Sequence, residues 1–221
     1  LTATEKEIEL SEEARTATFS PDVAAARKAA VGLNVPRIGM RLHLPKNMKH
    51  IEYYGRGPLE NYPDRNAGSM LGIYNSTVAD MYFPYVRPQE NGHHTDTRWI
   101  SLKDENGHGI LIKGDAPMGF NALHNSVEDF DSEEAKQHDY QWNNFTPKEI
   151  ADHNPARAHN RLRRMTHIND IQPRNFVELC IDMKQQGVAG YNSWGARPEP
   201  AYTIPANKDY SWGFMIIPIT K

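Results

Sequence analysis

The chain has 221 residues, which is long enough to bury a sizeable core in one domain. A net charge of −3 and the lack of a lysine–arginine stripe exclude a nucleic-acid-binding footprint, and no apolar run is long enough for a membrane span. Cys180, the only cysteine, cannot form an internal disulfide, and its neighbours Leu179 and Ile181 predict a small core residue.

The first residues predict that the chain begins inside a β-sheet. Thr4–Leu10 and Arg15–Ser20 have the pattern of a strand pair, and 22–31 predicts a loop with one helical turn. Leu1 is not an initiator methionine, and the first residues lack a basic start and an apolar stretch. We therefore expect a soluble piece of a larger multidomain protein, cytoplasmic or periplasmic, with 1–35 contributing N-terminal strands and a loop.

Alternating apolar residues predict strands along the rest of the chain. Between Ile38 and Leu44 every second residue is apolar, which is typical of a strand with one buried face. Further strands are predicted at Ser69–Tyr74, Arg98–Leu102, Gly109–Ile112, Val177–Met183 and Trp212–Ile219. Pro218 indicates an edge strand or the end of a strand, because proline cannot donate to a ladder. We expect an all-β fold of two packed antiparallel layers, with 1–221 as a single β-sandwich domain.

One short helix is predicted at Thr146–Ala151. Thr146 can act as N-cap, Pro147 stands at the first helical position, and Glu149 completes a capping box. The preceding acidic run, from Glu128 to Glu134, predicts a solvated loop or helix start. Adjacent like charges on such a segment are poor geometry for a catalytic pair of carboxylates. We therefore expect no catalytic residue in this chain.

The segment Gly187–Gly195 predicts a tight loop with one large aromatic side chain at its tip. Its glycines permit sharp turns, and Asn192 and Ser193 can brace the loop through local hydrogen bonds. The face of Trp194 suits stacking on the C–H-rich face of a sugar. The alternative is that Trp194 fills the end of the core, as large aromatics commonly do.

Other polar residues favour structural roles. A belt of tyrosines and prolines over 53–88 predicts packing against turns, braced by ion pairs among Arg56, Glu60, Asp64 and Arg65. Arg87, Glu90 and Arg98 predict a second clamp, near a cleft or purely structural. His93 predicts a surface-loop histidine that could approach a sugar hydroxyl. Because His93 and His94 point to opposite faces of an extended segment, we predict no metal site.

Four motifs follow one another in a fixed order: Pro36–Met40, Tyr54–Arg65, Tyr85–Gly92 with Thr97–Trp99, and the tryptophan loop. This order resembles the C-terminal small-chain domain of the family 2 β-galactosidases, from Pro36 to the end of the chain. The string from Gly55 to Arg65 is its most specific part. The family pattern has glycine at Ala189 and aspartate at Tyr191, which puts the loop's polar contacts in question.

The resemblance implies a galactose mutarotase-like β-supersandwich over 36–221. It also implies that the parent enzyme hydrolyses terminal β-galactosides with retention, through glutamates in a separate (β/α)₈ barrel. This domain would then supply Trp194, with Asn192 and Ser193, and one wall of the cleft. The expected partners are the sugar, the parent's other domains and further copies of the parent. No cofactor is expected in this chain, and a divalent cation in the parent stays open.

Two other functions remain open at this point. A stand-alone carbohydrate-binding module would bind sugar saturably without turnover. An aldose epimerase-like enzyme would share the expected fold and would need its own acid and base facing one sugar pocket. Mutarotation of glucose or galactose by the purified chain distinguishes these two alternatives.

Overall fold

The computed structural model describes residues 32–130 and 168–220, and these fall into two units. The described part of the smaller unit is 32–34 with 205–210, where the Ala206 amide donates to the Leu33 carbonyl at 2.8 Å. The larger unit spans Val35–Ile204 and Ser211–Lys221 and carries the seven strands found among the described residues. The predicted N-terminal strands, the loop over 22–31 and the helix at Thr146 lie outside the described residues. The single-domain organisation stays a prediction.

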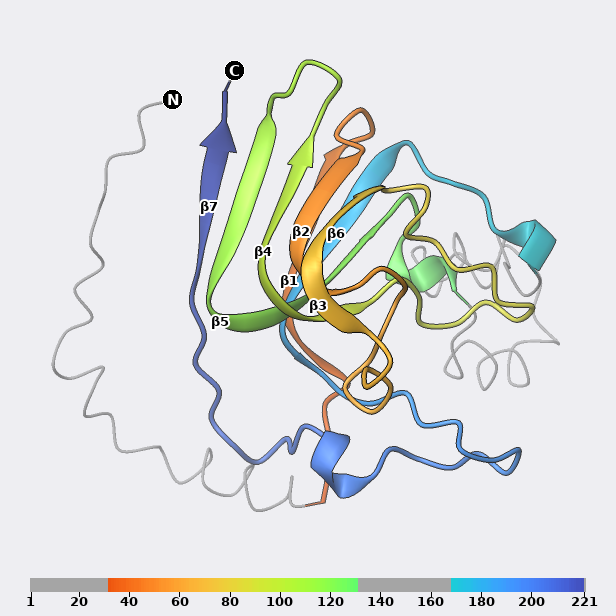
Figure 1. Cartoon of the computed structure of the whole chain (residues 1–221). Helices are drawn as coiled ribbons and strands as arrows, with labels where there is room; N and C mark the ends of the chain where they lie inside the picture. The colour runs from red at the N-terminus through yellow and green to blue at the C-terminus, as the bar shows by residue number, and fades with distance from the viewer. Residues whose placement is uncertain (1–31, 131–167, 221) are drawn as a thin grey trace, which may run out of the picture. The chain divides into compact units, whose positions relative to one another are not determined.

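The larger unit is an all-β structure, as predicted (Figure 1). Its described strands are β1 (Arg37–Pro45), β2 (His50–Gly57), β3 (Met70–Thr77), β4 (His94–Lys103), β5 (Gly109–Leu123), β6 (Phe176–Gln185) and β7 (Phe214–Ile219). The helical segments among the described residues are single 3₁₀ turns: η1 (Val127–Asp129), η2 (Ile168–Asp170) and η3 (Pro200–Tyr202). All strand pairs are antiparallel, in the order β1-β6-β5-β4-β2-β3, with β7 paired to β5.

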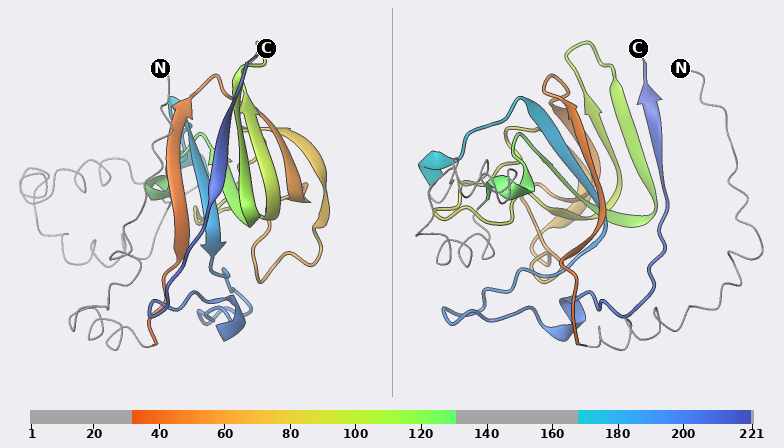
Figure 2. Two further views of the ribbon diagram at one scale, coloured as in Figure 1. Left: turned by 90° about the vertical axis from the view of Figure 1, so that its left-hand side faces the viewer. Right: turned by 180° about the vertical axis from the view of Figure 1, so that it is seen from behind.

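The long strand β5 joins two layers. Its first half, Gly109–Gly114, pairs with β7, and its second half, Gly119–Leu123, pairs with β6, while both halves pair with β4. Between the halves the exposed residues 115–117 form a bend. In Figure 2, β1 and β6 lie on one side of the core, and β4, β2 and β3 lie on the other. The expected layers are therefore parts of one continuous sheet rather than two separately hydrogen-bonded sheets.

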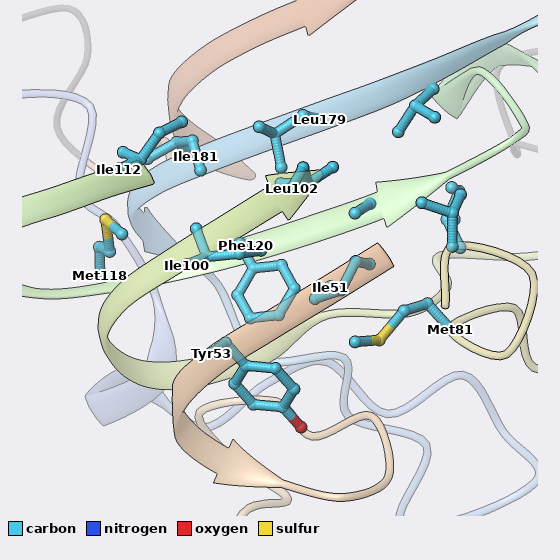
Figure 3. Close-up of a cluster of buried hydrophobic side chains, with 14 of the residues drawn as sticks. Ile51, Tyr53, Met81, Ile100, Leu102, Ile112, Met118, Phe120, Leu179 and Ile181 are labelled. Carbon is cyan, nitrogen blue, oxygen red and sulfur yellow. The ribbon is translucent and has the colours of Figure 1, made fainter. Parts of the chain in front are cut away.

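Side chains from both halves of this sheet meet in one core. Figure 3 shows Ile112 next to Ile181, and Leu102 next to Leu179. The Phe120 ring contacts the Tyr53 ring edge-on, with 5.0 Å between centroids. Burial of such side chains is worth about 1.5–3 kcal/mol each, so this cluster is the main stabilising feature of the layered arrangement. Cys180 is buried and free, and burial raises its pKa to about 12.

The predicted strands agree with the structure where apolar and polar residues alternate regularly. Elsewhere the prediction missed strands. The strand at Ile38–Leu44 is β1, and β7 pairs only with β5 in the described part of the chain, which confirms the edge position of Pro218. β2 was missed, because its two adjacent tyrosines were interpreted as packing against turns. Its alternate residues Ile51 and Tyr53 are nevertheless fully buried.

No helix in residues 32–130 or 168–220 has the length and apolar character needed to span a membrane.

Candidate functional site

Trp194 stands at the tip of the loop that follows β6. Its side chain is 93% exposed, so the alternative that it fills the end of the core is wrong. The backbone amide of Trp194 donates to Asn192 Oδ1 at 2.8 Å, which confirms the bracing role predicted for Asn192. Ser193 lies between them and is exposed. The loop thus presents a large aromatic face to solvent on a locally ordered turn.

The base of this loop is held by a carboxylate from a distant part of the chain. Asp64 accepts hydrogen bonds from the amides of Val188, at 3.1 Å, and Ala189, at 2.7 Å. The Tyr191 hydroxyl also donates to Asp64, at 3.1 Å. A carboxylate that accepts several N–H and O–H donors is an effective brace, since each charge-assisted bond is stronger than a neutral one. Asp64 therefore fixes the start of the tryptophan loop.

Backbone geometry explains two features of the loop sequence. Ala189 has φ +54° and Gly190 has φ +81°, which is the left-handed region that favours glycine. Any Cβ at Gly187 would lie 2.4 Å from Asp64 Oδ2, so a side chain there would displace the brace. Tyr191, where the family pattern has aspartate, uses its hydroxyl as a further donor to Asp64.

Glu60 fixes the turn that carries Asp64. Its side chain accepts from the Gly92 amide at 2.7 Å, and the Tyr85 hydroxyl also donates to it. Arg65 forms an ion pair with it at 2.9 Å, as the sequence predicted. Arg56 pairs with Asp96 at 2.5 Å, and its guanidinium also donates to the Ser69 carbonyl at 2.8 Å, in the connection between β2 and β3.

Two members of the predicted clamp of Arg87, Glu90 and Arg98 contact residues outside it. Arg87 is exposed. Glu90 lies 3.4 Å from the Arg37 guanidinium, which comes from β1. The Arg98 guanidinium lies over the Tyr54 ring, 5.4 Å from its centroid. Glu90 and Arg98 have these partners because the sheet brings β1 and β2 next to their segments.

His93 is buried, and the expectation of a surface-loop histidine is wrong. Only 1% of the residue is exposed, and its ring stacks on Tyr62 with 5.5 Å between centroids. Its Nδ1 lies 2.8 Å from Asn121 Oδ1 and 3.7 Å from Asp182. His94 is buried in different surroundings, with its ring stacked on Phe120. The strand pattern places each imidazole in a separate packed environment.

Buried charges surround His93. Arg37 Nε lies 3.0 Å from Asp182 Oδ1, and Arg37 Nη2 donates to Asn121 and Gln185 at 2.5 Å each. Burial raises the pKa of Asp182 to about 7 despite the guanidinium, and burial lowers the pKa of His93 to about 3. Asp182 is fully buried, so a sugar cannot reach its carboxyl group. This cluster holds strands together and offers no exposed acid.

The acidic run behaves differently from its prediction. Val127–Asp129 does form a single helical turn, but Asp129 is buried and bonded to Arg174 rather than solvated. Arg41 pairs with Glu128 at 2.6 Å and lowers the pKa of Glu128 to about 2. A carboxylate that is so readily ionised cannot serve as a proton donor at neutral pH. The residues beyond Phe130 in this run lie outside the described residues.

The described ranges contain no group of three or more His, Cys, Asp or Glu side chains placed to hold a metal ion.

The sequence model of the family "β-galactosidase small chain" matches residues 3–216, which is nearly the whole sequence. The chain belongs to the β-galactosidase small-chain family. Among its relatives, a β-galactosidase of Priestia megaterium is 31% identical over 185 residues, and one of Lactobacillus delbrueckii subsp. bulgaricus is 30% identical over 185 residues. In each case the match covers 84% of this chain. The β-galactosidase BgaC of Bifidobacterium adolescentis is 29% identical over 180 residues.

The small-chain match covers only a minor part of these enzymes. The chain spans about 15% of the length of the curated relatives it matches. The family therefore supports the description of this chain as a glycoside hydrolase-like domain, and no more specific function.

Sequence reasoning missed the residue that organises the loop. Asp64 was grouped with its neighbours as a local brace, yet its partners are Val188, Ala189 and Tyr191. The available signal was Gly187, the first residue of the loop, because a glycine leaves room for a side chain from another part of the chain. Only the fold, which places the turn after β2 beside the end of β6, reveals which side chain fills that room.

Proposed function

We propose that this chain is the sugar-facing small-chain domain of a β-galactosidase-like glycoside hydrolase. In this proposal Trp194 stacks on the galactose ring, while the loop forms one wall of the active-site cleft. A barrel elsewhere in the longer enzyme supplies the acid and the nucleophile for retaining hydrolysis of terminal β-galactosides. The domain contributes binding rather than chemistry.

The observation that carries the proposal is the 93% exposure of Trp194 on a loop tied down by Asp64. An exposed tryptophan on an anchored loop offers a flat apolar face on which a sugar ring can stack. The anchored loop keeps the ring available without the entropic cost of ordering a flexible segment on binding. The names of the relatives, all β-galactosidases, give the class of sugar.

The acidic residues support binding without catalysis. Retention needs two carboxyl groups about 5–5.5 Å apart that flank the sugar. Glu128 and Glu178 are both engaged by Arg41, and Asp129 by Arg174. These carboxylates have cationic partners and are poor candidates for donating a proton to a leaving group.

Nitrophenyl-β-galactoside hydrolysis by the purified chain tests this division of labour. We expect no turnover above buffer, because the barrier to glycosidic cleavage stays nearly intact without a proton donor and a nucleophile. Turnover that co-purifies with the chain and disappears on mutating one of its own acidic residues would overturn the proposal. Mutarotation of galactose by the chain would favour the epimerase alternative.

A further inference from the structure

A pocket lies at the base of the tryptophan loop, and Trp194 is not part of its lining. It has a volume of about 300 Å³, at the lower end of the range of about 300–1,000 Å³ for small-molecule sites. Gln185, at the end of β6, and Tyr202, whose carbonyl accepts from the Gly187 amide, both line it. Its apolar lining comes from Pro63, Pro117, Met118, Met183 and Ile204.

His93, Gly119 and Gln185 form what we call the floor of the pocket. The side chains hydrogen-bonded behind this floor determine which of its atoms can donate and which can accept. Asn121 Nδ2 donates to the Asn91 carbonyl at 2.5 Å and to Glu90 at 3.0 Å, so Asn121 Oδ1 is the atom that faces His93. His93 Nδ1 must therefore carry the proton. Burial keeps this imidazole neutral, with its pKa lowered to about 3. His93 Nε2 then has a free lone pair and is an acceptor.

Gly119 allows this edge of the ring to reach the pocket. A Cβ at Gly119 would lie 2.4 Å from His93 Cε1 and 2.6 Å from Nε2, so only glycine leaves room for the imidazole. His93 and Gly119 both line the pocket. Beside them, Gln185 Oε1 accepts from Arg37 at 2.5 Å, which leaves the Gln185 amide N–H₂ as a donor. The floor thus combines one acceptor and one donor, and both are uncharged.

An irregularity in β4 aims two consecutive side chains at the same pocket. In a regular strand Thr95 and Asp96 would face opposite sides. Here the β4–β5 register shifts between His94 and Thr97, and Asp96 has φ +53°, so both Thr95 and Asp96 line the pocket. Bulges and strained residues of this kind commonly re-aim side chains at functional sites.

We propose that this pocket binds a small neutral polyhydroxylated molecule, of the monosaccharide class, at a site distinct from the stacking face of Trp194. Hydroxyl groups of such a molecule can donate to His93 Nε2 and accept from the Gln185 amide. The apolar walls suit the C–H-rich face of a sugar ring. The lining carries one charge of each sign, on Asp96 and Lys184, so it favours neither an anionic nor a cationic ligand.

The test is galactose titration followed by saturation-transfer NMR on the full chain. Trp194→Ala removes the stacking face and should leave the affinity at this pocket within twofold. Ala201→Trp, on exposed η3 at the pocket lining, should weaken it at least fivefold. The control Ala79→Trp introduces the same bulk at an exposed alanine away from the pocket and should have no effect.

A second variant addresses the chemistry of the floor. Gln185→Glu keeps an oxygen for Arg37 and replaces the donor by a charged acceptor, so galactose binding should fall at least fivefold while the melting temperature reports folding. Absence of saturable galactose binding, or binding abolished by Trp194→Ala and insensitive to Ala201→Trp, would overturn the proposal. The second outcome would leave the role of Trp194 intact.

Discussion

Asp64 Oδ2 accepts a hydrogen bond from the Ala189 amide at 2.7 Å, although 125 residues separate the two in sequence. The carboxylate comes from the turn after β2, and the amide comes from the loop after β6. Because this contact depends on the completed sheet, the position of Trp194 depends on a turn far from it in the chain. The loop is consequently a product of the fold and not of its own glycines alone.

Replacing Asp64 by alanine should loosen the tryptophan loop. The amides of Val188 and Ala189 lose their acceptor, so their hydrogen exchange should accelerate, and galactoside affinity of an enzyme carrying this domain should fall. Hydrogen bonds to charged groups contribute about 1.5–3 kcal/mol. Because Asp64 is half-exposed, we expect the free energy of unfolding to drop by about 1–2 kcal/mol.

Asp80→Ala is the matched control for this variant. Asp80 is exposed and bonds only to its neighbour Thr77 among the contacts found for its side chain. Its loss should change stability by less than about 0.5 kcal/mol. Equal exchange rates at Val188 in the wild type and in Asp64→Ala would rule out the bracing role.

Ala189→Gly should stabilise the chain slightly. A left-handed conformation costs a residue with a Cβ about 1–2 kcal/mol, and the extra chain entropy of glycine offsets about 0.5–1 kcal/mol of that cost. A gain of up to about 1 kcal/mol in urea unfolding is expected. Ala122→Gly, in the buried second half of β5, should instead destabilise the chain. Similar losses in both variants would mean that Ala189 is not strained.

Regular alternation was sufficient to find most of the sheet. β1 and β6 were predicted because their apolar residues occupy every second position over a whole strand. The second half of β5 was missed, although Met118, Phe120 and Ala122 alternate there with Gly119 and Asn121. The side of Gly119 and Asn121 is buried against the polar cluster around Asp182. Glycine and asparagine have low strand propensity, which hides a strand whose polar side is buried.

The candidate site was only partly accessible from sequence. Trp194 and the brace by Asn192 could be predicted because both depend on local turn chemistry. Asp64 as the anchor and the burial of His93 could not, since both arise from contacts between segments distant in sequence. The clamp of Glu90 and Arg98 was inferred from proximity in sequence, whereas Glu90 pairs with Arg37 from β1.

The pH dependence of stability should carry the signature of three buried groups. Burial lowers the pKa of His93 to about 3 and that of His94 to about 4, so both resist protonation in the fold. Their stabilising contribution is present above their unfolded pKa, about 6.5, and is lost as pH falls through their folded pKa. Asp182, whose pKa is raised to about 7, acts in the opposite direction. Its contribution is present below about pH 4 and is lost as pH rises through 7.

Between pH 4 and 6 the two histidines should outweigh Asp182, so stability should fall on acidification. Asp182→Asn removes the opposing group and should steepen this fall by up to about 1.4 kcal/mol per pH unit. His94→Phe should make the fall shallower by a similar amount. Urea melts at several pH values measure these slopes independently of any constant loss of stability. Identical slopes in all three proteins would contradict the assignment.

The most direct test of the account is Trp194→Ala, measured for stability in this chain and for galactoside affinity in an enzyme that carries it. We expect the free energy of unfolding to change by less than about 0.5 kcal/mol, because the side chain is 93% exposed. Affinity should fall by about 1–3 kcal/mol, as for other aromatic stacking platforms. Trp212→Ala, at a tryptophan packed on the core next to Phe214, should show the reverse. A stability loss of about 3–5 kcal/mol in Trp194→Ala with unchanged affinity would contradict the account.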